Sequence, residues 1–511
     1  MKRYTLVLIL SLLFCFILVF CPKFCIIKAS GTIYITADGS INPSTVNITT
    51  VDRINYTFTA DISDSIIVQR NNIIIDGANY RLQGTGSGSG FSLTSISNVT
   101  IKDVNIENFY YGIYFDHSSL NTISRSNLTG NTYGIWLFCS SKNTLRNNIM
   151  VGNRWGFGIW GWSLSGYLND VDGSNMIEGK PIYYLLNQEN LIINPTTFPD
   201  VGYLALVNST RIKIENLTLT NGYHGMLLAY TRNSIISNNK VADNEFGIFL
   251  FSSSNNTVSK NNAIHNYVGI EFHTSSNNNT ITENNITNNT KGLGTEFSSN
   301  NIILRNNITA NKVYGILLYS TSYCTISENN VIGNTIGIGF SPSSSSNTVS
   351  RNTISKNSEC GIQLSQCSNN SVYYNNFIND THQVITLGSD NTNFWDNGYP
   401  SGGNYWSDYN GTDIKSGPYQ NETGSDGIGD TPHIIDGNNK DCYPLMTPYP
   451  PLRSDLNRDG RVDGKDIAVV AQAFASYPSH KRWSFQADLN SDKKIDGMDL
   501  IIVAKNWGKK A

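Results

Sequence analysis

The sequence predicts a mainly β protein, a right-handed parallel β-helix with coils of about 22–24 residues, followed by a small α-helical calcium-binding domain. Three observations lead to this fold class. Asparagine-rich phrases such as NTITENNITNNTKG (residues 279–292) recur at a fixed period. Charged residues make up only 15% of the chain but hydrophobic residues 39%, which favours a packed fold over disorder. An acidic pattern of calcium-loop length occurs twice near the C-terminus.

The N-terminus is typical of a secretory signal, because Lys2 and Arg3 precede an apolar run from Thr5 to Phe20. We expect residues 1–29 to be this signal, which predicts a secreted or cell-surface protein. The alternative is an uncleaved anchor, and only then would the protein be attached to a membrane. Asn-x-Ser/Thr acceptors fit glycosylation of a secreted archaeal or eukaryotic protein. A net charge of −3 gives no basic surface, so we expect no nucleic-acid partner.

The repeat is marked by a glycine before an apolar pair, and this marker returns once in every coil. A fixed period of this length indicates a solenoid. Because Asn, Gly and β-branched residues dominate, its units are strands rather than helices. Parallel crossovers are right-handed, so the solenoid should be too. The markers of seven successive coils are Gly225, Gly247, Gly269, Gly292, Gly315, Gly337 and Gly361.

A second column of residues predicts an asparagine ladder along the solenoid. Side-chain amides on successive coils, about 4.8 Å apart, can hydrogen-bond to one another. Asn also tolerates the left-handed backbone of a sharp turn. The residues one position earlier alternate in charge and should attract their neighbours. The ladder would hold Asn238, Asn261, Asn284, Asn306, Asn329, Asn352 and Asn375, and the charged column Lys260, Glu283, Arg305, Glu328 and Arg351.

The repeat ends after Asn375, where Trp395, Tyr405, Trp406 and Tyr409 follow with several acids. The open end of a β-helix must be covered to prevent edge pairing. We therefore divide the chain into a β-helix (30–375), a C-terminal cap (376–447), a linker (448–453) and the calcium-binding domain (454–511).

One irregular stretch, GIWGWSLSGYLNDVDG, interrupts the markers between Gly156 and Gly225. A longer loop at this point would present Trp160, Trp162 and Tyr167 on one face, beside two aspartates. Exposed aromatic rings beside carboxylates suit sugar stacking, so these three residues are carbohydrate-binding candidates. The alternative is that the rings pack the loop onto the solenoid.

Glu271 and Glu296 are the best catalytic candidates in the repeat. Each precedes a phenylalanine expected to point inward, so both glutamates should face outward on successive coils. A separation of about 5 Å would suit a retaining glycosidase. The alternative is that both are incidental surface acids.

The C-terminal part of the chain contains two calcium-binding loops of the EF-hand kind, one beginning at Asp455 and the other at Asp488. Oxygen ligands fall at positions 1, 3, 5, 7 (backbone), 9 and 12. An amphipathic helix follows each loop, with apolar residues at i, i+3 and i+7. Lys493 replaces the expected glycine at position 6 of the second loop, which should weaken that site. The predicted ligands are Asp455, Asn457, Asp459, Arg461, Asp463 and Asp466 in the first loop, and Asp488, Asn490, Asp492, Lys494, Asp496 and Asp499 in the second.

Two resemblances follow from these motifs. The stretch NNIIIDGANYRLQG, the Asn/Gly coils and the ending GGNYWSDYNGTDIKSGPYQNETGSDGIGDTPHIIDGNNKDCYPLM resemble the NosD-like family of secreted right-handed β-helix proteins, which belong to the carbohydrate-binding and sugar-hydrolase repeat class. Founding members assist copper delivery, but the seven histidines here form no recurring pair. The duplicated loops resemble a type I dockerin, which implies calcium at two sites and a cohesin partner. By this resemblance, cohesin recognition falls on Gly464, Lys465, Gly497 and Met498.

Three functions remain open on the sequence. The first is a secreted or cell-surface β-helix that binds carbohydrate or surface polymer and docks to a cohesin. The second is a polysaccharide-degrading hydrolase or lyase. The third is a structural or adhesion protein in which the helix is a spacer.

Overall fold

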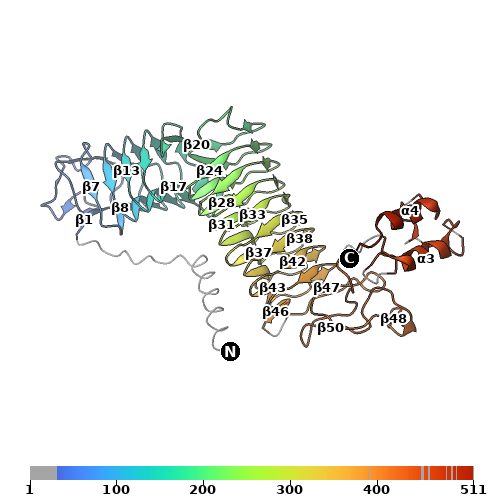
Figure 1. Cartoon of the computed structure of the whole chain (residues 1–511). Helices are drawn as coiled ribbons and strands as arrows, with labels where there is room; N and C mark the ends of the chain where they lie inside the picture. Colours follow the sequence, from blue (N-terminus) through green and yellow to red (C-terminus); the bar gives the residue numbers. More distant parts are fainter. Residues whose placement is uncertain are drawn as a thin grey trace. The chain divides into compact units, whose positions relative to one another are not determined.

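The computed structural model describes residues 31–388, 391–449, 454–457, 461–478, 480–484, 487–490 and 492–509. The predicted signal segment, residues 1–29, lies outside these residues, as do 450–453 of the predicted linker and Asp459 of the first calcium loop. The chain divides into two compact units that meet in sequence between Ile182 and Tyr183. In both units short strands stack in parallel from coil to coil (Figure 1).

The first unit has three sheets, and each coil contributes one strand to each sheet. Strands pair in parallel except at β1–β2, β3–β4 and β19–β20. One sheet contains β1 (Thr32–Ile35), β2 (Ile41–Asn42), β5 (Ser65–Val68), β8 (Ser89–Thr94), β11 (Tyr111–Asp116), β14 (Tyr133–Phe138) and β17 (Trp155–Trp160). The second contains β3 (Ile48–Thr49), β4 (Asn55–Phe58), β6 (Ile73–Asp76), β9 (Val99–Lys102), β12 (Thr122–Ser124), β15 (Thr144–Arg146) and β18 (Asp170–Val171). The third contains β7 (Arg81–Gln83), β10 (Asn105–Glu107), β13 (Asn127–Thr129), β16 (Ile149–Val151) and β19 (Met176–Ile177), and β20 (Lys180–Leu186) follows it in the chain.

The second unit repeats the arrangement with longer sheets. The sheet that carries the predicted glycine markers contains β22 (Tyr203–Val207), β25 (His224–Ala229), β28 (Phe246–Phe251), β31 (Val268–His273), β34 (Lys291–Glu296), β37 (Tyr314–Tyr319), β40 (Ile336–Phe340), β43 (Cys360–Ser365) and β46 (Val384–Leu387). Another contains β21 (Ile192–Ile193), β23 (Lys213–Glu215), β26 (Ile235–Ser237), β29 (Thr257–Ser259), β32 (Thr280–Thr282), β35 (Ile302–Leu304), β38 (Thr325–Ser327), β41 (Thr348–Ser350) and β44 (Ser371–Tyr373). The last contains β24 (Thr218–Thr220), β27 (Lys240–Ala242), β30 (Asn262–Ile264), β33 (Asn285–Thr287), β36 (Asn307–Thr309), β39 (Asn330–Ile332), β42 (Thr353–Ser355), β45 (Asn376–Ile378) and β47 (Tyr405–Trp406).

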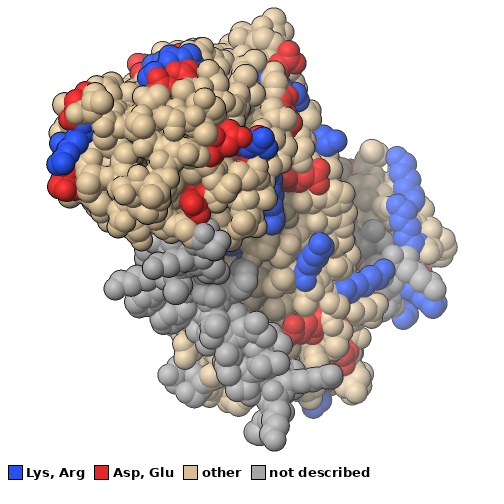
Figure 2. Space-filling view, turned by 90° about the vertical axis from the view of Figure 1, so that its left-hand side faces the viewer, with Lys and Arg blue, Asp and Glu red and all other residues tan. Residues whose placement is uncertain are grey.

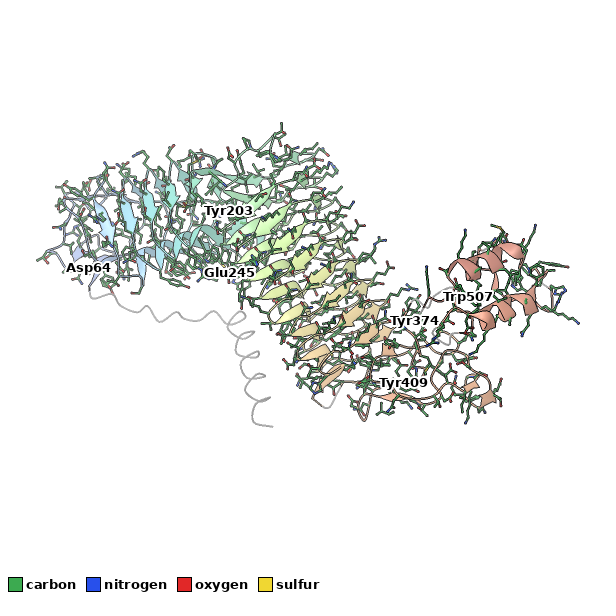
Figure 3. The ribbon with its side chains drawn as sticks, in the orientation of Figure 1. Asp64, Tyr203, Glu245, Tyr374, Tyr409 and Trp507 are labelled. Carbon is green, nitrogen blue, oxygen red and sulfur yellow. The ribbon has the colours of Figure 1, made fainter. Side chains whose placement is uncertain are left out.

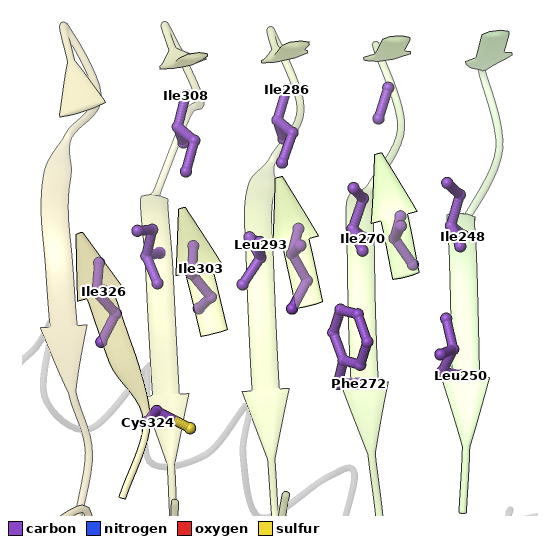
Figure 4. Packing of buried hydrophobic residues seen from close by; sticks show 14 of the residues in the cluster. Ile248, Leu250, Ile270, Phe272, Ile286, Leu293, Ile303, Ile308, Cys324 and Ile326 are labelled. Carbon is purple, nitrogen blue, oxygen red and sulfur yellow. The ribbon is translucent and has the colours of Figure 1, made fainter. Parts of the chain in front are cut away.

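The core of the second unit is a set of stacked apolar columns. Ile248, Ile270, Leu293 and Ile316 are in register on the successive strands β28, β31, β34 and β37, each one coil after the other. All four side chains are fully buried. Those of Ile248, Ile270 and Leu293 stack from coil to coil in Figure 4. Burying each such side chain contributes about 1.5–3 kcal/mol. The predicted period is therefore the period of the core.

The predicted asparagine ladder is confirmed from Asn261 to Asn375. Each buried side-chain oxygen accepts two hydrogen bonds, from the backbone N–H and the side-chain amide of the asparagine one coil earlier, both at 2.9–3.0 Å. Two further columns of this kind run beside it, one through Asn256 and Asn279 and one through Asn266 and Asn289. Nearly identical asparagine phrases thus close the turns of the solenoid.

The prediction was wrong for the first member of the ladder. Asn239, not Asn238, bonds to Asn261, and Asn238 is exposed with φ 56°. In later coils too, the residue just before the ladder asparagine has the left-handed backbone conformation. Charged residues such as Lys260 and Glu283 occupy this position, with φ of 56° and 57°. Of the charge pairs expected in that column, Lys260 and Glu283 form one, at 3.6 Å.

Residues 391–449 follow the last coil and extend its ladders. Asn375 donates to Asn404 at 3.0 Å, and Asn404 donates in turn to the buried carboxylate of Asp441. The Trp406 ring stacks on Phe377 at 4.3 Å. This segment also contains β48 (Lys415–Ser416), β49 (Glu422–Thr423), β50 (His433–Ile434) and β51 (Lys440–Asp441). Its role as a cap stays a prediction that truncation can test.

Three short helices complete the described fold: α2 (Leu164–Tyr167), α3 (Gly464–Ala473) and α4 (Gly497–Lys505). The helices α3 and α4 pack on a small core that includes Val462, Val470, Ile495 and Val503. No helix among the described residues is long and apolar enough to cross a membrane. On the face drawn in Figure 2, the described acidic and basic groups are interspersed.

Candidate functional site

Glu271 and Glu296 lie on the outer face of the sheet β22–β46, the face opposite the core. Ile270 and Phe272 point into the core, so Glu271 between them points outward. The expected alignment of the two glutamates was wrong. Glu271 is opposite Gly294 on the next coil, and Glu296 is opposite His273. Phe297 was expected to point inward, but it takes a left-handed conformation (φ 51°) in the turn after β34 and is exposed.

The two glutamates nevertheless meet through Lys291, the first residue of β34. The Lys291 ammonium lies 2.8 Å from an oxygen of Glu271 and 2.8 Å from an oxygen of Glu296. His273 Nε2 is 3.7 Å from the other oxygen of Glu296. We call Glu271, Lys291, Glu296 and His273 the charged cluster. Lys291 was not among the predicted site residues, although its place in the KGLGTE strand beside Glu296 was a signal.

Gly294 leaves the space that the Glu271 carboxylate occupies. A Cβ atom at position 294 would lie 2.3 Å from Glu271 Oε2, so any side chain there would displace the carboxylate. The Glu271 side chain is only 2% exposed, and its Oε1 atom has no hydrogen-bond partner among the described residues. A buried carboxyl oxygen without a donor is costly unless something else supplies one.

The environment separates the pKa values of the two carboxyl groups. Burial raises the pKa of Glu271 to about 8, because removal from water disfavours the charged form more than Lys291 favours it. The pKa of Glu296 is lowered, since the charges of Lys291 and His273 outweigh its burial. Burial lowers the pKa of His273. Burial thus favours the neutral form of Glu271, whereas the neighbouring charges favour the ionised forms of Glu296 and Lys291.

Three aromatic rings lie near this cluster, of which Phe297 is exposed and Phe251 is fully buried. The His273 ring stacks on Phe251 at 5.8 Å, with an angle of 16° between the planes. Phe297 lies 6.2 Å from His273 and 5.2 Å from Tyr319. Carboxyl groups beside aromatic rings are the combination that binds sugars, through hydroxyl hydrogen bonds and ring stacking.

Of the three aromatic residues predicted to bind carbohydrate, only one is exposed to solvent. Tyr167 in α2 is fully buried and Trp160 at the end of β17 is nearly so, which corrects both predictions because a buried ring cannot stack on a sugar. Trp162 is half exposed and packs edge-on against Trp160 at 5.9 Å. The nearby aspartates Asp170 and Asp172 pair with Arg146 instead of framing a sugar site.

The two predicted calcium loops have the same hydrogen-bond pattern. Asp466, at position 12, accepts from the backbone N–H groups of Leu456, Asn457 and Asp463 at 2.6–3.1 Å. Asp499 accepts from Leu489, Asn490 and Asp496 in the same way. These bonds fold each loop back onto the start of its helix. Lys493 has φ 66° at the position where the pattern expects glycine.

The predicted ligands fit calcium by their chemistry. Asp466 and Asp499 are fully buried, and Asp455 and Asp488 nearly so, and buried carboxylates require pairing or a cation. The donors are all oxygens, which suits a hard cation. Among the described residues, which exclude Asp459, no group of three or more His, Cys, Asp or Glu side chains is placed to hold a metal ion.

The four residues assigned to cohesin recognition are the first two of α3, Gly464 and Lys465, and of α4, Gly497 and Met498. All four are exposed. Apolar side chains are exposed nearby at Phe474, Tyr477, Ile501 and Trp507, and Trp507 lies beside the helix pair (Figure 3). Phe474 and Trp507 are the apolar i+7 residues of the two predicted amphipathic helices. Both are exposed, and Leu456, Ala487 and Leu489 complete the small core instead.

Comparison with known proteins gives three family matches. The model described as "Right handed beta helix region" matches residues 31–198 and 182–331. The model described as "Periplasmic copper-binding protein (NosD)" matches residues 276–411, and "Dockerin type I domain" matches residues 452–508. No curated protein sequence matches the chain significantly.

Solved structures with a similar fold and low sequence identity include two epimerases and one phage tailspike. A double mutant of the periplasmic alginate epimerase AlgG is 13% identical, with a TM-score of 0.35, covering 72% of this chain and 83% of its own. The A-module of the Azotobacter vinelandii mannuronan C-5 epimerase AlgE4 is 14% identical, with a TM-score of 0.35 and coverage of 65% and 91%. A tailspike of the E. coli bacteriophage HK620, in complex with a pentasaccharide, is 10% identical, with a TM-score of 0.31 and coverage of 68% and 59%.

Proposed function

The chain belongs to the right-handed β-helix family and carries a NosD-like stretch and a C-terminal type I dockerin domain, and from this premise we propose two linked activities. The dockerin domain, loaded with calcium at its two loops, binds a cohesin-bearing scaffold or surface protein outside the cell. The β-helix binds carbohydrate on its outer face and is thereby displayed on that scaffold.

The observation that supports docking is the exposed apolar surface at the N-terminal ends of α3 and α4. Met498 and Trp507 are each 55% exposed in a domain with only a small core. Exposed apolar groups of this size, rimmed by polar residues, mark protein interfaces. Calcium bound at the loops would fix the first turns of both helices, because the loop aspartates Asp463 and Asp496 are also the helix N-caps.

The docking test measures capture of the full-length protein by immobilised cohesins, with calcium and then with chelator. We expect calcium-dependent capture that Met498→Asp and Lys465→Glu weaken at least tenfold. Lys505→Ala, an exposed change in the last turn of α4, is the matched control and should bind as the unaltered protein does. Capture that persists in chelator, or that ignores both variants, would overturn the docking proposal.

The observation that supports carbohydrate binding is the charged cluster with its aromatic surroundings on β31 and β34. Charged groups on the outside of a solenoid have no role in its core, and beside them the Phe297 ring is 42% exposed, as a ring that stacks on a sugar must be. The test is depletion of the protein by insoluble or gel-embedded polysaccharides. Phe297→Ala should weaken retention, whereas Tyr323→Ala, an exposed ring in a turn of the following coil, should not. Equal retention of both variants would contradict this location.

A structural or adhesive spacer is the remaining alternative from the sequence. It predicts normal cohesin capture with no retention on any polysaccharide. The same depletion experiment therefore separates it from the proposed function.

A further inference from the structure

The loop after β17 carries an exposed aromatic ring that is separate from the charged cluster and belongs to the first compact unit. Trp162 in this loop is 50% exposed, although its ring packs edge-to-face with Trp160 at 5.9 Å and with Phe138 at 6.4 Å. A large apolar ring that is held by its neighbours and still open to solvent adds little to the core. Rings of this kind are typical of recognition surfaces.

Close backbone packing holds this loop in place. A Cβ atom at Gly161 would lie 3.2 Å from Gly166 Cα, and one at Gly166 would lie 3.1 Å from Gly161 Cα, so both glycines permit an approach that a side chain would crowd. The side-chain amide of Asn169 then donates to the carbonyl of Ser140 on the preceding coil, at 2.9 Å. These contacts fix the position of Trp162 on the outer face.

Three residues on successive coils continue the surface. Asp116, Phe138 and Trp160 are the last residues of β11, β14 and β17 and are paired in register. The residue before each of them is fully buried, so strand alternation directs all three outward. Phe138 is partly exposed, and the nearly buried Trp160 supports Trp162. Because coils are about 4.8 Å apart, this line of residues extends about 10 Å along the solenoid.

Asp116 and His117 form the polar end of this line. His117 Nδ1 lies 2.5 Å from Asp116 Oδ1, and Asp116 Oδ2 has no hydrogen-bond partner among the described residues. Both side chains reach solvent, with 24% of the Asp116 side chain and 59% of the His117 side chain exposed. The His117 ring lies 5.9 Å from the Phe138 ring, so the polar and aromatic groups adjoin. We call Asp116, His117, Phe138, Trp160 and Trp162 the aromatic row.

We propose that the aromatic row is a second carbohydrate site, which binds an extended neutral polysaccharide chain along the axis of the first unit. Trp162 stacks on the flat face of one sugar ring. Asp116 accepts hydrogen bonds from the hydroxyl groups of a sugar farther along the chain. This inference goes beyond the proposed function, because it requires neither the charged cluster nor the dockerin domain.

The chemistry of the aromatic row favours a neutral chain over an acidic one. A carboxylate is an acceptor only, and sugar hydroxyls are the donors that an uncharged chain offers. A uronate would bring a second carboxylate toward Asp116, and like charges at short range repel. Stacking on Trp162 also requires a flat sugar face lined with C–H groups, which β-1,4-linked glucose and xylose provide.

The spacing of the aromatic row predicts how binding depends on chain length. Asp116 and Trp160 are two coils apart, which is about 10 Å, and one sugar unit lengthens an extended chain by roughly one coil step. A disaccharide therefore covers only one end of the aromatic row. Affinity should rise as units are added to a disaccharide and should level off once the chain spans from Trp162 to Asp116.

The test uses the full-length protein with calcium and β-1,4-linked oligomers of glucose, xylose and mannose, each with two to six units. Oligomers of galacturonate are the acidic probes, and calorimetry measures binding. The variants are Trp162→Ala, Trp162→Phe and Asp116→Asn. Tyr80→Ala and Glu107→Gln are the matched controls, because Tyr80 is an exposed ring and Glu107 a partly exposed carboxylate elsewhere in the same unit. Circular dichroism checks that each variant is folded.

We expect one neutral oligomer to bind, about tenfold or more weakly in Trp162→Ala and in Asp116→Asn, with part of the loss recovered in Trp162→Phe and none in the controls. Bound sugar should also protect a tryptophan from acrylamide quenching, and Trp162→Phe should lack this protection.

Unchanged binding by Trp162→Ala, or preference for the acidic oligomers, would overturn this site. Weaker binding by Phe297→Ala but not by Trp162→Ala would overturn it and leave the proposed function intact. Binding of none of the oligomers would also overturn it, whereas the proposed function is judged by its own depletion experiment.

Discussion

Replacing Asn306 by Ala tests how much one member of the asparagine ladder stabilises the solenoid. The Asn306 side-chain oxygen accepts from the backbone N–H and the side-chain amide of Asn284, at 3.0 and 2.9 Å. Its own amide donates to the carbonyl of Ile281 at 2.9 Å and to the oxygen of Asn329 at 3.0 Å. The amide also donates to the carbonyl of Leu304 at 3.1 Å, so alanine removes five hydrogen bonds of a buried side chain.

The magnitude follows from the groups that lose a partner. The backbone N–H of Asn284 becomes an unsatisfied buried donor, which costs about 1–3 kcal/mol. The side-chain amide of Asn284 keeps its bond to Val258 at 2.9 Å, so it adds little. We therefore expect Asn306→Ala to lower the free energy of unfolding by about 1–3 kcal/mol.

Urea unfolding followed by circular dichroism measures this change, and hydrogen exchange of the Asn284 amide shows whether the loss is local. Asn307→Ala is the matched control, because Asn307 is exposed and its side chain makes a single bond, to Asn285 at 2.9 Å. It should change stability by less than about 0.5 kcal/mol. Equal effects of the two variants, or unchanged exchange at Asn284, would refute the view that the ladder carries stability.

Four further changes give distinct expectations. Asp380 ends another ladder, and burial raises the pKa of its carboxyl group to about 6, above the pKa of an aspartate in the unfolded chain. Its contribution to stability is therefore complete below about pH 4 and is lost as the pH rises through 6. Asp380→Asn should abolish this dependence in thermal unfolding from pH 4 to 8 and be the more stable form at pH 8; parallel curves would contradict it. Cys324 occupies a ladder position, where its sulfur accepts from the Asn301 N–H at 3.3 Å and donates to the Ser298 carbonyl at 3.9 Å. Because sulfur bonds are weaker than those of an amide, Cys324→Asn should raise the free energy of unfolding by about 0.5–1.5 kcal/mol, and a loss would count against it. Truncation after Asn375 should expose the apolar interior and the ladder ends of the last coil and give aggregates by size-exclusion chromatography, whereas a soluble monomer would argue against the cap. The segment 454–511 should gain helical circular dichroism on calcium addition and lose it with chelator, because its core is small and its buried aspartates repel one another without a cation; an unchanged spectrum would refute calcium-dependent folding.

The architecture of this protein could be predicted from its repeat alone. A repeat of nearly constant length fixes which residues stack, since each coil must place its apolar side chains over those of the coil before. Ile270 and Leu293 could therefore be placed in one buried column without a structure. The duplicated acidic loops were equally informative, because ligand spacing and the helix that follows are local in sequence.

The contacts between outward side chains could not be predicted from the repeat and are known only from the three-dimensional fold. Asn238 and Asn239 are equally good ladder residues by composition, and a slip of one residue moves a side chain from the buried turn to solvent. Lys291 joins Glu271 and Glu296 because β31 and β34 pair with Glu271 opposite Gly294, a register that depends on the length of the intervening turns. Tyr167 illustrates the same limit, since its burial depends on how α2 folds back onto neighbouring coils. The residues that stack in one column follow from the period alone. Contacts between side chains of different columns depend on turn geometry, where a shift of one residue changes the partner. Coils that differ slightly in length do not specify that geometry.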